Sequence, residues 1–139
     1  MAKDDQKYQF FLSQSRKEIP KLERRIAAIT SQMQLMLDLA DSPILDASTL
    51  LREANSCMKG LFKVNGDVRT TIGNAQGHIK KLPRDQKAKA NADFRGQVIG
   101  LDKKYMSKAS ATAEKLNKVA TAKMKDARVS NVSADPFVV

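Results

Sequence analysis

The chain has 139 residues and a formal net charge of +10, from 25 basic and 15 acidic side chains. With 42% hydrophobic and 29% charged residues, it is neither an acidic disordered tail nor a membrane protein, because no apolar run approaches the roughly 20 residues that span a bilayer. A single cysteine, no tryptophan and 5% aromatic residues argue against a disulfide framework, a Cys-based zinc site and a β-sandwich. We therefore expect an all-α protein of a reducing compartment.

The first predicted helix covers residues 8–40. Pro20 falls inside it, and proline removes a helical hydrogen bond and clashes with the preceding turn, so we expect a kink or a fresh helix start there. Spacings of three and four alternate along its apolar and small residues, which is typical of a helix with one buried stripe. This stripe comprises Leu12, Ser15, Ile19, Leu22, Ile26, Ile29, Met33, Met36 and Ala40.

The second predicted helix covers residues 43–82, with Ser42 as its N-cap and Pro43 at its first position. Four glycines, at 60, 66, 73 and 77, weaken it by up to about 1 kcal/mol each. Asn65 lies in its stripe, where it either fixes the register against a partner helix or faces water at a bend. The stripe comprises Ile44, Ala47, Leu51, Ala54, Met58, Leu61, Asn65, Val68, Ile72, Ala75, Ile79 and Leu82.

The third predicted helix covers residues 85–127, with Asp85 as its cap, and residues 130–139 are expected to form a disordered tail or linker. Short connections make neighbouring helices antiparallel. The sequence therefore predicts one domain, residues 1–129, built as an antiparallel up-down-up bundle of three long helices. Its predicted core contains Leu22, Ile26, Ile29, Met33, Leu51, Met58, Leu61, Val68, Ile72, Ile79, Phe94, Val98, Leu101, Tyr105 and Leu116.

The usual catalytic groups are scarce, so we expect no enzyme activity, no catalytic residue, no cofactor and no metal. His78 is the only histidine and is interpreted as a solvated residue on the flank of a helix, since no second ligand lies at helical spacing. Cys57 is interpreted as a half-buried packing thiol without a base beside it. The glycines form no phosphate-binding loop, because no GxxxxGK[ST] motif is present.

Basic residues gather around the second connection, at Lys80, Lys81, Arg84, Lys87 and Lys89. This basic patch is either a solvated loop or a weak contact for phosphates of an anionic membrane. Nucleic acid is not an expected partner, because aromatic residues do not alternate with the basic ones. The third helix carries more lysines, which we expect to surround it: Lys103, Lys104, Lys108, Lys115, Lys118, Lys123 and Lys125.

The pattern resembles the N-terminal Habc domain of syntaxin-type SNARE proteins, an antiparallel bundle of three long helices. RRIAAITSQMQLMLDLADSP resembles the first Habc helix and the turn after it, and NGDVRTTIGNAQGHIKKLP resembles the end of the second. NADFRGQVIGLDKKYMSKASATAEK is similar to the third, with Phe94 and Tyr105 eleven residues apart. The resemblance covers residues 18–133. The glycines of the second helix depart from it, and no SNARE motif or membrane anchor follows.

This resemblance implies a regulatory interaction domain of vesicle traffic and membrane fusion, at the cytosolic face of an endomembrane. Its partner would be a SNARE-motif helix or an SM-family regulator, bound in a groove between helices. Alternatives are a self-assembling structural subunit and a basic protein that coats nucleic acid or anionic membrane. Under the first reading the chain is a cytoplasmic monomer, and its groove uses apolar residues left over from the stripes: Leu37, Leu45, Leu50, Phe62 and Ile99.

Overall fold

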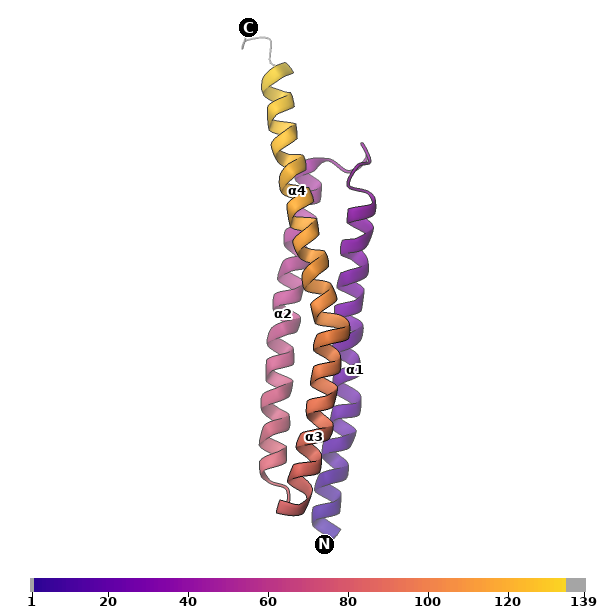
Figure 1. The fold of residues 1–139 in the computed structure, drawn as a ribbon, viewed down its shortest axis with the longest axis vertical. Coiled ribbons are helices and arrows are strands. Elements are labelled where there is room, and N and C mark those ends of the chain that lie inside the picture. The colour runs from indigo at the N-terminus through magenta and orange to yellow at the C-terminus, as the bar shows by residue number, and fades with distance from the viewer. Residues whose placement is uncertain (1, 135–139) are drawn as a thin grey trace.

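The computed structural model describes residues 2–134 as an all-α bundle of three long rods, which confirms the predicted fold class (Figure 1). The first rod is α1 (Ala2–Asp38) and the second is α2 (Ala47–Lys80). The third consists of α3 (Arg84–Leu101), the π-helical segment η1 (Asp102–Met106) and α4 (Ser107–Ala134), which follow one another without a break. We call this rod the third helix. Its two neighbours pack against it and against each other along the bundle.

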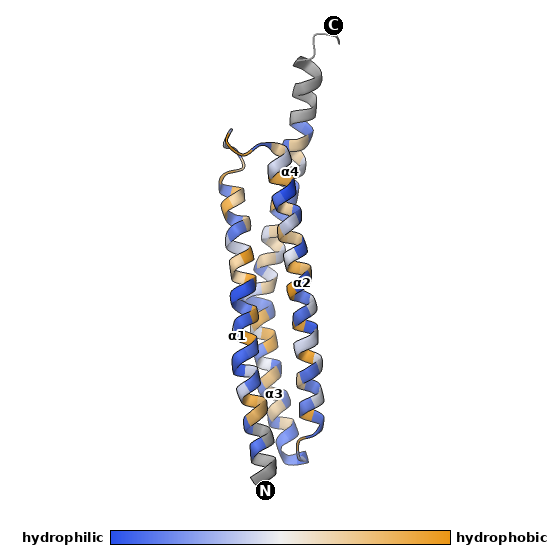
Figure 2. Ribbon diagram, turned by 180° about the vertical axis from the view of Figure 1, so that it is seen from behind, coloured by the Kyte–Doolittle hydropathy of each residue, from blue (hydrophilic) through white to orange (hydrophobic). Residues whose placement is uncertain are grey.

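The core runs along the axis where the three rods meet. All the predicted core residues lie in it or pack against it; those that are only half-buried are Ile29, Leu51, Met58, Ile72, Val98 and Tyr105. Phe11, beside the predicted Leu12, is an addition to the core. Its side chain is 1% exposed, and its ring meets that of Phe94 edge to face with 5.9 Å between the centroids. Figure 2 shows that apolar and polar residues alternate along each rod, as burial of one stripe requires.

The buried stripe of α2 differs from the prediction in one of its two tracks. Residues 47, 54, 61, 68 and 75 are buried as predicted. In the first half of α2 the companion track lies three residues after them and not four, so Leu50, Cys57 and Val64 are buried while Leu51 and Met58 are half-buried. Near the end of α2, Ile79 is buried as predicted. The prediction that Leu50 is available to a partner in a groove is therefore wrong, because Leu50 is 0% exposed in the core.

The connection between α1 and α2 is longer than predicted. Asp46 and not Ser42 caps α2, because its carboxylate accepts a hydrogen bond from the Thr49 backbone N–H at 2.7 Å. The Ser42 hydroxyl instead accepts from the Ile44 N–H within the connection, at 3.3 Å. Pro43 consequently lies in the connection and not at a helix start.

Lys123 of α4 fastens this connection to the third helix. Its ammonium donates to the backbone carbonyls of Ala40, at 2.6 Å, and of Ser42 and Leu45. These residues are about 80 positions away from Lys123 along the chain. Their three carbonyls have no partner in a helix ladder, and all three accept hydrogen bonds from the same ammonium group. The contact fixes the end of α1, the start of α2 and α4 relative to one another.

The other helix boundaries differ where backbone chemistry outweighs pattern. α1 continues through Pro20 without the predicted new start. At the second connection the Pro83 carbonyl accepts from the N–H groups of Gln86 and Lys87, so Asp85 lies in the first turn of α3 and is not its cap. The third helix continues to Ala134, past the predicted end near 127, because no glycine or proline interrupts it before Pro136. Residues 130–134 are thus helical and not a tail, while 135–139 lie outside the described residues.

The π-helical segment η1 corrects the register of the third helix. Its neighbouring core residues Leu101 and Ala109 are both fully buried, although eight residues separate them where a regular stripe has seven. A π turn takes up one extra residue. The wider turn therefore brings both side chains to the same face and places Met106 at the side of the bundle.

Candidate functional site

An apolar groove runs along the surface between α2 and the third helix. It consists of two hollows of about 420 and 430 Å³ that share Asn65 of α2 and Met106 of η1. The upper hollow extends to Ala113 and Asn117 of α4, and the lower one to Val98 and Ile99 of α3. We call this feature the α2–α4 groove.

Two of the five predicted groove residues line it. Phe62 lies on the α2 side and is 73% exposed, and Ile99 lies on the α3 side and is 44% exposed. Large apolar side chains with this exposure are unusual enough on a monomer to mark a contact surface when they cluster. Leu37 and Leu45 do not belong to the groove, because neither lines its two hollows; both pack half-buried against the core elsewhere. Leu50 does not belong to the groove either, because it is buried in the core.

Asn65 lies at the centre of the groove and not in the buried stripe. Val64 occupies the stripe at 2% exposure, which turns the Asn65 side chain to the half-buried flank. There its amide is available to hydrogen-bond a polar group entering the groove. Met58 and Met106 flank it with flexible thioether side chains, which adapt to differently shaped partners.

Charges at the rim of the groove differ between its two ends. The lower hollow is bordered by Arg69, Lys103 and Asp102. The upper hollow is bordered by Glu114, which forms an ion pair with Lys118 at 3.5 Å. A partner helix would meet a mainly basic rim at one end and an acidic side chain at the other.

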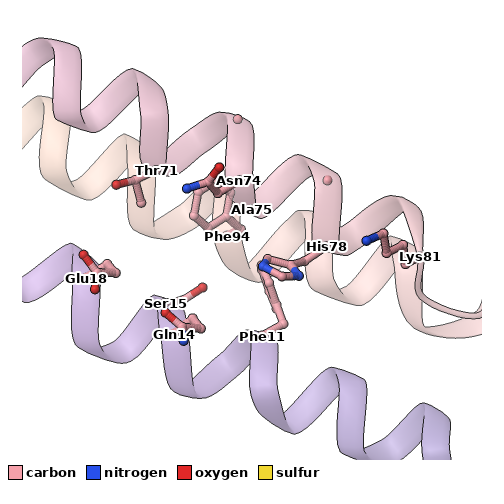
Figure 3. A pocket seen from close by; sticks show the side chains of 12 residues that line it. Phe11, Gln14, Ser15, Glu18, Thr71, Asn74, Ala75, His78, Lys81 and Phe94 are labelled. Carbon is pink, nitrogen blue, oxygen red and sulfur yellow. The ribbon is translucent and has the colours of Figure 1, made fainter.

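A polar cleft of about 550 Å³ separates α1 from α2 near the second connection (Figure 3). Glu18 and Gln14 line it from α1, Asn74 and His78 from α2 and Lys81 from the residue after α2, together with the rings of Phe11 and Phe94. Within the described residues no hydrogen bond joins the carboxylate, imidazole and ammonium groups of this cleft.

His78 and Cys57 occupy separate environments. The half-buried His78 ring meets Phe10 edge-on, with 5.5 Å between the centroids. Cys57 is 4% exposed, more buried than predicted, and its pKa is raised by burial and by the nearby Glu53 carboxylate. A thiol with a raised pKa carries little nucleophilic thiolate. Among the side chains that the structure describes, no group of three or more His, Cys, Asp or Glu is placed to hold a metal.

The predicted basic patch gathers at one end of the bundle, around the α2–α3 connection. Figure 2 shows this end as largely hydrophilic. All its members are exposed except Lys87, which is half-buried; they are Lys80, Lys81, Arg84, Lys87 and Lys89. Lys80 and Lys81 stand at the C-terminus of α2, where the helix dipole favours a positive charge.

The lysines of the third helix lie on several of its sides, as predicted. Lys103 borders the groove, and Lys123 is tied to the α1–α2 connection. The other five are exposed, follow one another at spacings of four, seven, three and seven, and spread over the side of the helix turned away from the core; they are Lys104, Lys108, Lys115, Lys118 and Lys125.

In the part of the chain that the structure describes, every helix is too short or too polar to cross a membrane. No family model, no curated protein and no solved structure matches this chain.

Proposed function

We propose that this chain is a non-enzymatic regulatory interaction domain of the syntaxin-like SNARE type, acting at the cytosolic face of an endomembrane. Its task is to hold an amphipathic helix, either a SNARE motif or a helix of an SM-family regulator, in the α2–α4 groove. The observation that carries the proposal is the groove itself, with Phe62 73% exposed on one wall and Ile99 44% exposed on the other.

The groove suits a helix because it is long, apolar at its floor and polar at its rim. An amphipathic helix presents apolar residues at spacings of three and four, and these would insert between the side chains of α2 and the third helix. Covering a large exposed ring such as that of Phe62 is worth about 1.5 to 3 kcal/mol. Arg69 and Glu114 at opposite ends of the rim would favour one direction of the bound helix.

Holding such a helix would regulate fusion by competition. A SNARE helix seated in the groove buries the same apolar stripe that it needs to join a SNARE bundle. The domain would therefore keep that helix out of the fusion complex until another partner displaces it, and no chemical step is required.

The test is a titration of the chain with a synthetic SNARE-motif helix, followed by calorimetry. The variant Phe62→Asp places a charge in the groove, whereas the control Leu35→Asp places one on α1 at a side chain that is 57% exposed and outside the groove. We expect Phe62→Asp to weaken binding at least about tenfold, since a buried unpaired carboxylate is costly. Leu35→Asp should bind like the unmodified chain. Equal losses in both variants, or none in either, would contradict the proposal.

A further inference from the structure

The five exposed lysines on one side of the third helix form a surface that neither the fold nor the groove explains. We call Lys104, Lys108, Lys115, Lys118 and Lys125 the lysine ridge. With a rise of 1.5 Å per residue it extends about 32 Å along the bundle. Small residues, including Ala111 and Ala122, lie between the lysines, and Glu114 is the acidic side chain beside Lys118.

The ridge does not serve the stability of the bundle. Among the described residues, Lys118 forms an ion pair with Glu114 at 3.5 Å, with side chains 77% and 71% exposed. Pairs this exposed contribute little to folding. Like charges four residues apart, as at Lys104 and Lys108, repel one another and lower helix stability slightly. The ridge therefore lowers the stability of the fold slightly. Its ammonium groups are suited to binding an anion outside the chain.

We propose that the lysine ridge lies on the surface of an anionic lipid bilayer, with the long axis of the bundle parallel to the membrane. A line of ammonium groups on flexible stems matches a layer of anionic headgroups, which offers charge everywhere and demands no fixed geometry. Nucleic acid is the weaker match, because the ridge has no arginine and no aromatic side chain with which to grip or stack on bases.

The bound orientation leaves the α2–α4 groove open. The third helix contributes Met106, Ser110 and Asn117 to the groove, on the side that faces α2. Lys108 of the ridge lies on the flank that faces α1, where it borders Thr30, Gln34 and Leu35, whereas Lys118 pairs with Glu114 at the rim of the upper hollow. The ridge therefore meets the groove only at this ion pair, and the inference does not rest on the proposed function.

The test is cosedimentation of the full chain with vesicles of phosphatidylcholine containing about 30% phosphatidylserine, at about 0.1 M salt. The ridge variant carries Lys→Gln at 104, 108, 115 and 118. The matched control carries Lys→Gln at 17, 21, 59 and 63, exposed positions on α1 and α2. Each variant lowers the net charge from +10 by four, and glutamine keeps helix propensity close to that of lysine.

Each lysine near an anionic surface strengthens binding about fivefold, so the ridge variant should lose several hundredfold in partition coefficient. The partition coefficient of the control should fall far less. Vesicles of phosphatidylcholine alone should bind neither variant. Equal losses in the two variants would show that only total charge matters and would overturn the proposal. So would an absence of binding by the unmodified chain. Tighter, ridge-dependent binding to a short DNA duplex at the same salt would assign the surface to nucleic acid and likewise overturn it.

Discussion

The register of α2 can be tested by truncating two adjacent leucines. Leu50 is 0% exposed, whereas Leu51 is half-buried. Leu50→Ala removes methyl groups from a closed core and leaves a cavity, which costs about 3 to 5 kcal/mol in the free energy of unfolding. Leu51→Ala removes the same atoms from a site open to water, where only part of the transfer free energy is lost, about 1 kcal/mol.

Urea unfolding followed by circular dichroism measures both variants. With a denaturant dependence of about 2 kcal/mol per molar urea, Leu50→Ala should lower the midpoint by about 1.5 to 2.5 M and Leu51→Ala by about 0.5 M. The two substitutions change helix propensity equally, so the difference isolates burial. Equal shifts, or a larger shift for Leu51→Ala, would refute the assigned register.

Three further predictions concern the connection, the cap and the glycines. Lys123→Met removes the donor to three carbonyls and should cost about 1 to 3 kcal/mol, with faster amide hydrogen exchange in residues 40–46. The Thr49 hydrogen bonds lower the pKa of Asp46, so its contribution to stability is present above the ordinary pKa of about 3.9 and lost as pH falls through the lowered value; Asp46→Asn should abolish that pH dependence in acid unfolding curves. Gly73→Ala should raise stability by about 0.5 to 1 kcal/mol, whereas Gly60→Ala should gain less because its Cβ would lie 3.3 Å from the Ile29 side chain.

The fold was predictable because the helical spacing of the apolar residues and the positions of the helix-breaking residues agree along most of the chain. Alternating spacings of three and four, interrupted near 41–43 and at Pro83, define three rods and two short connections. Pro136 in the sequence, in contrast, only limits how far the third helix could extend. It does not predict the residue at which that helix ends. Burial, the side-chain cap at Asp46 and the anchoring Lys123 decided the remaining boundaries, and burial and the Lys123 contact depend on segments far apart in the sequence.

The site was less predictable, since apolar residues alone do not say which side of a rod they face. Leu50 and Leu51 both fit the heptad pattern of α2, as do Cys57 and Met58. The third helix decides between them, because it leaves one track in the core and the other at the groove. Similarly, the four-seven-three-seven spacing of the ridge lysines was present in the sequence, but the side of the bundle on which they lie depends on how the third helix packs against α1 and α2.

The central claim is that the α2–α4 groove receives an amphipathic helix, and chemical-shift mapping tests it most directly. A SNARE-motif peptide is added to the isotope-labelled full chain, and amide shifts are followed in two-dimensional spectra. The account predicts changes concentrated at residues 58–72 of α2 and 98–117 of the third helix, with saturation at one peptide per chain. Changes confined to α1 or the α1–α2 connection, or none at peptide concentrations up to about 1 mM, would contradict it.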